Sequence, residues 1–545
     1  MTGVQTCALP IFQRSGALFA QDEWKITPSL TLNYGLRWEY LGPVREAYNL
    51  IDHFDLVNNE LITGRGPVYD LDNGTGLLQQ TGTLPPYRDN YVAIYSTVAP
   101  RIGFAYRLSG REDTVIRGGF GTYYGIPAIQ TWNSANGLGA PFLLSKLFTG
   151  PTPSKVTGIT TNPYQWGPTA FGSAGTQTVN SISITTENPH IRALYTDQYS
   201  LGIQHEFGKA ALVEISYQGS RTFHNVSTQN INIPSLETRL ANPAASVSVN
   251  ALRPYNTIGT DSKWSSVSYL SDGYYSNYNS LLLRAERRFA NGLNFQSYIV
   301  YAKSLEVSSL QDQYNFRSNY GPSAWDQKFR SVTSGVYSLP FGHGQRWFNS
   351  DSRLVDYTIG GWQASTVVTF QSGRPVNTST TDSLASFTGA SDRAFAVSGV
   401  SPTAKIDGNT GLRTGKPQDW FNTAAYRSND PANGTNYTSD TASGYVYNFG
   451  TAGFDSVRGP GLQDVDFGLI KHVRVNDHNS LEFRADAFNL LNHPNFTNPS
   501  AAYGGAEGSG ITPGTTAVIT STVNSTVPTA TGGPRQLQLA LRYAF

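Results

Sequence analysis

The chain has 545 residues, with 39 Lys and Arg against 38 Asp and Glu, so its net charge is +1. Charged residues make up only 14% of it, against about 25% in an ordinary soluble domain. The balanced charge excludes a typical nucleic-acid-binding protein, which carries a basic excess. A mean hydropathy of −0.32, without an apolar run of roughly 18 residues, excludes an α-helical membrane protein. Aromatics at 12% argue against disorder. A β-rich protein remains, either soluble or embedded in a membrane.

The first eleven residues differ from the rest. They contain the only Met and the only Cys of the chain, Met1 and Cys7. They lack the basic and long apolar regions of a secretory signal, and they resemble the translation of a sequencing-library adapter. We therefore expect residues 1–11 to be non-native and the natural sequence, of which 12–545 is a part, to extend upstream. A short native N-terminus is the alternative.

Apolar residues at every second position are the strongest pattern, and they predict strands with two different faces. Leu30, Leu32, Tyr34 and Leu36 show it near the N-terminus. The segments run for about ten residues, which fits a tilted membrane-spanning strand better than a soluble one of about 5–6 residues. Thirteen are expected, near 16–26, 30–41, 98–108, 114–124, 195–207, 211–221, 278–289, 293–304, 328–339, 359–371, 462–475, 479–491 and 534–545.

Short and long connections alternate between these strands. The short ones are rich in turn residues: 27–29, 109–113, 208–210, 290–292 and 476–478, with 340–358 as a less regular member. The long ones, expected to be loops without secondary structure, are 42–97, 125–194, 222–277, 305–327, 372–461 and 492–533. Tight periplasmic turns and long outer loops are typical of a transmembrane antiparallel β-barrel, so we predict that all-β fold.

Aromatic residues at the strand ends predict girdles at the two membrane interfaces. The expected inner-rim members are Trp24, Phe207, Phe289 and Phe545, and the expected outer-rim members are Trp38, Tyr40, Tyr217 and Tyr301. Asp22 interrupts the apolar row of the first strand, and the pattern offers no reason for it.

The first predicted strand descends from outside and the last ends inside at Phe545. Because a closed barrel has no edges, an odd number of strands is expected upstream. Nine more would give about 22, the size of plugged outer-membrane transporters. The chain is therefore predicted to be the C-terminal part of a barrel.

Four motifs are spread over the chain: Gln21-Asp22-Glu23-Trp24-Lys25 followed by the strand from Leu30 to Trp38, Trp420-Phe421-Asn422-Thr423-Ala424-Ala425, Arg458-Gly459-Pro460-Gly461, and the stretch from Leu481 to Phe496. Together they resemble motifs of Oar-like TonB-dependent receptors. The final Tyr543-Ala544-Phe545 resembles the signal that the barrel-assembly machinery reads. The resemblance implies a plug, a TonB box and a carboxypeptidase-regulatory-like domain in the whole protein.

A search for reaction chemistry finds no constellation. The eight histidines have no HxH or HxxxH spacing, and no cysteines could complete a zinc site. Asp70-Leu71-Asp72-Asn73-Gly74 has the wrong spacing for a calcium loop, and Gly118-Gly119-Phe120-Gly121 leads to no helix. Small residues where another surface approaches closely explain that glycine run better. No catalytic residue, cofactor or metal is predicted.

Polar residues on the expected inner face either line a transport path or balance one another's charges, and we favour the second interpretation. They are Arg37, Glu39, Arg101, Arg107, Gln204, Glu206, Glu214, Arg284, Glu286, Arg484, Asp486 and Arg542.

The sequence thus predicts an outer-membrane TonB-dependent receptor barrel for uptake of an unidentified ligand. Its expected partners are outer-membrane lipid, the barrel-assembly machinery, the TonB complex and an extracellular ligand, without nucleic acid. A passive porin or a surface adhesion barrel is the alternative. A soluble β-propeller is a third, disfavoured because no repeat of about 40–50 residues is apparent.

Overall fold

The computed structural model describes most of the chain from Ile11 to Phe545. The residues outside the described part are 1–10, 48, 50, 72–77, 87–88, 90, 109–112, 126–181, 209, 243–251, 256–263, 291, 309, 350–351, 381–391, 428–448, 455, 477, 504–515 and 525–530. Residues 1–10 of the segment expected to be non-native, and Asp72-Asn73-Gly74, therefore lie outside it.

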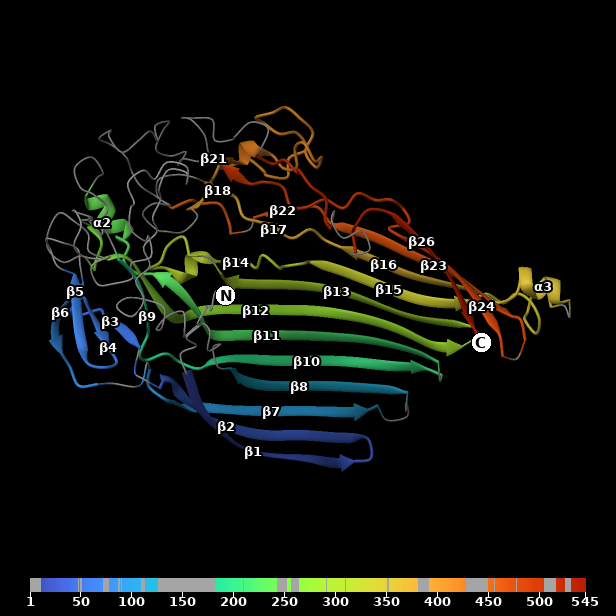
Figure 1. Cartoon of the computed structure of the whole chain (residues 1–545), viewed down its shortest axis with the longest axis horizontal. Helices are drawn as coiled ribbons and strands as arrows, with labels where there is room; N and C mark the ends of the chain where they lie inside the picture. Colours follow the sequence, from blue (N-terminus) through green and yellow to red (C-terminus); the bar gives the residue numbers. More distant parts are fainter. Residues whose placement is uncertain are drawn as a thin grey trace, which may run out of the picture.

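One large antiparallel sheet dominates the fold, and thirteen long strands follow one another across it in chain order (Figure 1). They are β1 (Ile11–Thr27), β2 (Leu30–Glu46), β7 (Ile94–Arg107), β8 (Thr114–Gly125), β10 (Leu194–Phe207), β11 (Ala211–Asn230), β12 (Trp264–Ala290), β13 (Leu293–Val307), β15 (Phe329–Ser338), β16 (Trp362–Gln371), β23 (Leu462–Arg474), β24 (Ser480–Phe488) and β26 (Gln536–Ala544). Each predicted strand has its counterpart, so the thirteen-strand prediction is confirmed. Nine further strands, for a total of about 22, stay a prediction.

The alternating apolar residues form continuous rows across the sheet. Leu201 pairs with Tyr217, Tyr217 with Leu281, and Leu281 with Tyr301. These four side chains are exposed on one face, here called the outer face. The opposite, inner face carries polar residues such as Gln204. Side chains alternate across a strand, so this register gives the sheet one apolar and one polar surface.

Two polar residues on the outer face have partners there. Asp22 pairs with Tyr34 across β1 and β2 and accepts a hydrogen bond from the Tyr34 hydroxyl at 3.1 Å. His205 lies 2.8 Å from the Thr114 hydroxyl through Nδ1. Cross-strand hydrogen bonds therefore satisfy both side chains.

The structure corrects several predicted strand ends. β12 begins at Trp264 rather than near 278, and β11 continues to Asn230 rather than 221. The two strands stay paired beyond the others, with bulges around Asn225. β24 ends at Phe488 rather than 491, because Asn489 has a left-handed φ of 44° that stops the strand.

The expectation that the long connections lack secondary structure is wrong. Figure 1 shows further strands at the ends opposite the tight turns. The connection after β2 forms a four-stranded sheet of β3 (Asp52–Asp55), β4 (Glu60–Thr63), β5 (Pro67–Leu71) and β6 (Leu78–Thr83). β9 (Ile182–Glu187) pairs in parallel with β12, whereas β14 (Tyr320–Pro322) pairs antiparallel with β13. Short helical segments are α2 (Leu236–Ala241), η4 (Phe316–Asn319), α3 (Arg353–Thr358) and η5 (Thr423–Ala425).

The connections after β16 and β24 form small sheets together. Their strands are β17 (Pro375–Val376), β18 (Ser379–Thr380), β19 (Asp392–Arg393), β20 (Phe395–Ala396), β21 (Tyr426–Arg427), β22 (Val457–Arg458) and β25 (Ala502–Tyr503). β18 pairs in parallel with β25, which joins one connection to the other. We call residues 372–461 and 492–533 the outer assembly.

The buried apolar clusters lie mainly in these connections rather than on the long strands. The largest groups Val376, Phe421, Tyr426, Val457 and Tyr503 with smaller residues of the outer assembly. A second joins residues of β3, β4 and β9 to the beginning of β12: Phe54, Leu61, Ile184, Trp264 and Val267. In the described part of the chain, no helix is long and apolar enough to cross a membrane.

Candidate functional site

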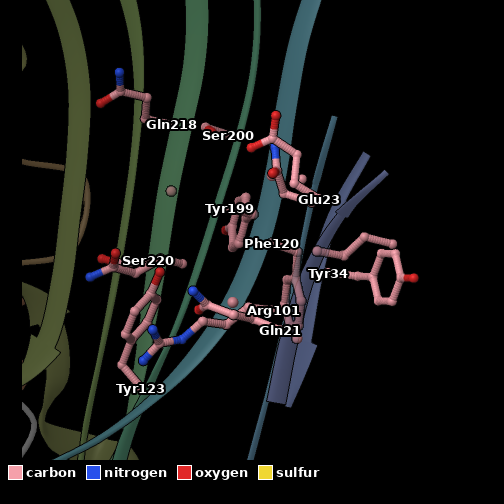
Figure 2. A pocket seen from close by; sticks show the side chains of 18 of the residues that line it. Gln21, Glu23, Tyr34, Arg101, Phe120, Tyr123, Tyr199, Ser200, Gln218 and Ser220 are labelled. Carbon is pink, nitrogen blue, oxygen red and sulfur yellow. The ribbon is translucent and has the colours of Figure 1, made fainter. Parts of the chain in front are cut away.

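The inner face of the sheet has a hollow of about 840 Å³ between β1 and the outer half of β12. We call it the inner hollow. Its inward-facing lining comes from six neighbouring strands and from Tyr278 in the middle of β12. These residues are Gln21, Glu23, Asn33, Gly35, Arg101, Gly103, Gly119, Gly121, Tyr123, Gln198, Ser200, Gln218, Ser220 and Tyr278. Figure 2 shows several of these side chains.

Glycines create this space. Gly103 pairs with Gly119 across β7 and β8, and Arg101 pairs with Gly121. A Cβ atom added at Gly119 would have no neighbour nearer than 3.5 Å. Position 119 thus has room for a side chain but carries none. A close approach is found at Gly118 and Gly121, where the Phe104 and Tyr123 rings would crowd an added Cβ atom, whereas Gly119 faces open space.

Polar groups surround the glycines. The Arg101 guanidinium lies over the Tyr123 ring, 4.6 Å from its centroid. The amides of Gln198 and Gln218 and the carboxylate of Glu23 border the same hollow. In Figure 2, Arg101 and Tyr123 lie together, whereas Tyr34 points away from the other labelled side chains. The inner hollow can therefore offer an arginine, an aromatic ring and several amides to a polar molecule.

Most of the predicted inner-face charges neutralise one another along their own strands. Arg37 contacts Glu39, Arg284 lies 2.6 Å from Glu286, and Arg484 lies 2.7 Å from Asp486. A second contact joins Arg284 to Glu214 at 3.8 Å. These pairs support the interpretation that alternating charges balance one another.

Arg101, like Arg107 and Arg542, makes no ion pair with a carboxylate of the described residues, but of these three arginines it alone lines the inner hollow. The sequence correctly places Arg101 on the inner face but does not distinguish it from the paired charges. Nor does the sequence pattern identify its neighbours Gln21, Tyr123 and Gln198 as part of a site. Two features of the sequence could have indicated the hollow: the glycine run at 118–121, and the alternation that places every second residue of the adjacent strands on the inner face.

The predicted interface aromatics lie on the outer face. Trp24, Phe207, Tyr217, Tyr301 and Tyr543 are exposed there, and so is the terminal Phe545. Trp38 and Tyr40 are half-buried because both contact Tyr95: the Trp38 indole donates to its carbonyl at 2.8 Å, and the Tyr40 ring lies 5.1 Å away. The side chain of Phe289 lies outside the described residues. Membership of these side chains in interfacial girdles stays a prediction.

The motif at 481–496 terminates a strand and ties it to its neighbours. The Asn489 N–H donates to the Asp466 carboxylate at 2.9 Å, and its side-chain amide donates to the His493 and Gly533 carbonyls. Asn495 is buried and accepts from the Gln463 N–H at 2.8 Å. The asparagines of this motif therefore stabilise the outer end of the sheet.

The motifs at 420–425 and 458–461 contact each other. The Trp420 indole donates to the Arg458 carbonyl at 2.7 Å. Arg458 in turn binds Asp326, a fully buried residue between β14 and β15. Both motifs thus attach the outer assembly to the large sheet. Among the residues that the structure describes, no cluster of three His, Cys, Asp or Glu side chains could hold a metal ion.

Solved structures similar to this chain are outer-membrane proteins. The outer membrane transporter YddB from Escherichia coli matches with 10% identity and a TM-score of 0.42, over 97% of this chain and 54% of its own. The ferripyoverdine receptor of Pseudomonas aeruginosa matches with 8% identity and a TM-score of 0.41, over 98% of this chain and 39% of its own. The chain thus spans about half of these proteins or less. A comparison with curated proteins found no match.

The family comparison covers nearly the whole chain. A family model described as an outer membrane beta barrel domain matches residues 4–538. The match agrees with the long antiparallel strands, the exposed apolar outer face and the polar inner face. The chain belongs to the outer membrane beta barrel domain family, and it resides in the outer membrane.

Proposed function

We propose that this chain is the barrel of an Oar-like TonB-dependent receptor that takes up a polar ligand through its lumen. The observation that carries the proposal is the inner hollow, where glycines leave about 840 Å³ open beside Arg101 and Tyr123. An open hollow of this kind does not stabilise a barrel wall, so a purely structural role does not explain it. The motifs at 420–425, 458–461 and 481–496 support the proposal through their resemblance to this receptor family.

In this proposal, the outer assembly meets the ligand and the inner face guides it. The arginine and the amides of the inner hollow exchange hydrogen bonds with the ligand as it passes, replacing those of water. Energy coupling belongs to the plug and TonB box that the resemblance implies for the whole protein. The barrel-assembly machinery would recognise the strand that ends in Tyr543 and Phe545.

The test follows depletion of compounds from a yeast-extract medium by mass spectrometry. Cells expressing the full-length protein are compared with cells that lack the gene, each with and without a protonophore. We expect the full-length protein to deplete particular compounds only while the proton gradient is intact. Loss of the TonB partner should abolish the same depletion.

The other outcomes identify the alternatives. Depletion that persists with the protonophore would indicate a passive porin. A compound that binds to the cell surface and can be washed off again, without accumulating inside the cells, would indicate an adhesion or structural barrel. Either result overturns the proposal of energised uptake.

A further inference from the structure

The connection between β15 and β16, residues 339–361, is unlike the other inner turns. The turn between β1 and β2 contains only Pro28 and Ser29, whereas this connection carries the helix α3. Figure 1 shows α3 projecting at the end of the sheet where the tight turns lie. We call residues 339–361 the β15–β16 link. It lies at the periplasmic rim of the barrel.

The link is attached to the outer face of the barrel wall. Lys471 pairs with Trp362 on one side and with Phe483 on the other, in the row that continues to Leu541. Its ammonium donates to the Asp356 carbonyl at 2.9 Å and also to the Gly360 carbonyl. A cation at the end of a helix satisfies carbonyls that have no partner within the helix.

The indole of Trp362 makes a second attachment. Its N–H donates to the Thr358 carbonyl at 2.9 Å, and the Lys471 ammonium lies 5.6 Å from the centre of its ring. Lys471 is buried by these contacts although it belongs to the lipid-facing row. The end of α3 therefore rests on the surface that faces lipid, not on the lumen.

The link exposes large apolar side chains beside this attachment. Leu354 is 75% exposed, Phe348 64% and Trp347 50%. Phe341 supports the two aromatics, with ring-centroid distances of 5.6 Å to Trp347 and 6.0 Å to Phe348. The exposed group thus belongs to the segment that leads directly into the beginning of β16, at Trp362.

Two cations accompany the apolar group. Arg346 and Arg353 are exposed, and neither makes an ion pair with a carboxylate of the described residues. The Arg346 guanidinium lies 5.7 Å from the centre of the Trp347 ring. Guanidinium groups bind phosphate oxygens through paired hydrogen bonds. Aromatic, leucine and arginine side chains together are typical of a segment at a lipid interface.

We propose that the β15–β16 link is an interfacial anchor that binds anionic phospholipid of the periplasmic leaflet. Trp347, Phe348 and Leu354 enter the boundary between headgroups and acyl chains, and Arg346 and Arg353 bind lipid phosphates. The lipid-facing row that contains Lys471 and Trp362 runs directly into this segment, so the same lipid that surrounds the barrel covers it. The inference is independent of what the barrel transports.

The first experiment measures contact with lipid in nanodiscs of phosphatidylethanolamine and phosphatidylglycerol. Full-length protein without other cysteines receives Phe348→Cys or Leu354→Cys, each labelled with a small fluorophore. The control is His478→Cys in the turn between β23 and β24, another exposed site at the same rim. We expect a lipid carrying a quencher at headgroup depth to quench the labels at 348 and 354 several-fold more than the label at 478. Iodide in the water should show the reverse order.

Equal quenching of all three labels by iodide, without an effect of the lipid quencher, would overturn the anchor. A heat-modifiable band shift in gel electrophoresis verifies that each variant has folded. The labelled positions are exposed, so folding does not depend on their side chains.

A second experiment tests the arginines. Arg346→Gln with Arg353→Gln should reduce lipid quenching of the label at 354 in nanodiscs containing phosphatidylglycerol. The reduction should be much smaller when phosphatidylcholine is the only lipid, because the attraction to net anionic lipid is then absent. An unchanged signal in both lipids would remove the phosphate contact from the proposal.

Discussion

The guanidinium of Arg458 binds the carboxylate of Asp326, a residue 132 positions earlier in the chain. Asp326 is fully buried, and it also accepts from the Ser304 N–H at 2.6 Å and from Lys303 at 3.3 Å. Burial by itself raises the pKa of Asp326, but these hydrogen bonds and cations outweigh it and hold the pKa below its ordinary value. One carboxylate thus joins β13, β15 and the outer assembly.

Asp326→Asn should weaken this junction strongly. The change leaves Arg458 and Lys303 near a neutral amide, and breaking one partner of a buried ion pair costs about 3–5 kcal/mol. Hydrogen exchange of residues 452–461, measured by mass spectrometry in lipid nanodiscs, should become faster. The matched control is Asp89→Asn, because the pair of Asp89 with Arg45 is exposed and such pairs contribute about 0–1 kcal/mol. Similar effects of both changes would contradict the role of Asp326.

The two faces of the barrel should respond differently to a new charge. Leu36 lies on the outer face and is exposed there; Leu36→Lys or Leu539→Lys should lower the free energy of unfolding by roughly 2–4 kcal/mol near the membrane midplane. Gln538→Lys, next to Leu539 but facing the lumen, should cost far less. Urea unfolding in lipid vesicles measures the three values. Equal costs would contradict the assignment of faces.

A side chain at position 119 should obstruct the inner hollow without disturbing the fold. Gly119 has space for a Cβ atom, so Gly119→Gln should extend an amide among Arg101 and Gln198. We expect several-fold slower uptake of the compounds found in the depletion experiment, with unchanged urea unfolding. Gly119→Ala is the control, since a methyl group is too short to fill the space. An equal loss of uptake in both variants would mean that the hollow is not part of the path.

A pair of carboxyl groups should make the outer assembly sensitive to pH. Burial alone raises the pKa of Asp407, but hydrogen bonds from Thr423, Asn409 and Thr410 outweigh it and lower that pKa. Burial, followed by the charge of Asp407, raises the pKa of Asp419. Asp407 therefore stabilises the folded state above its unfolded pKa and loses this effect as the pH falls through its folded value. Asp419 stabilises below its unfolded pKa and loses the effect as the pH rises through its folded value.

The two carboxyl groups together thus stabilise the folded state most in acidic solution. This stabilisation declines toward neutral pH, because Asp419 then ionises beside the charged Asp407. Hydrogen exchange of residues 404–427, corrected for the intrinsic pH dependence, should be slower near the ordinary pKa of an aspartate, about 4, than at about pH 7. Asp419→Asn should abolish the difference, because an amide does not ionise and can still accept from Thr410. A variant that keeps the full difference would assign it to another group.

The period-two pattern contained most of the information needed for the large sheet. Each strand has one face toward lipid and one toward the lumen, so every second residue reports its side directly, as Leu201 and Gln204 do. Asp22 and His205 are polar, but they lie on the outer face as the alternation predicts, and each forms a hydrogen bond with a cross-strand neighbour. The short turns were predictable because Gly, Pro, Asn and Asp mark special backbone angles.

The outer assembly could not be predicted in the same way. Its strands are two residues long in places, as in β18 and β25, and their partners lie in different connections. Such short segments show no period, and their stability comes from buried neighbours such as Phe421 and Tyr503 that are distant in sequence. The inner hollow was missed for a related reason. It depends on four glycines from three strands meeting on one face, which requires the register between strands.

The parallel pairing of β18 with β25 restricts the order in which this protein can be assembled. Ser379 and Thr380 precede β23 and β24 in the chain, whereas their partners Ala502 and Tyr503 follow them. The two segments meet only after the intervening hairpin has crossed the bilayer and returned. The apolar cluster of the outer assembly, which contains Tyr503, therefore closes only after β23 and β24 have formed. Before β18 and β25 pair, the outer connections of a newly inserted barrel would remain apart. Contacts between segments this distant in sequence form slowly.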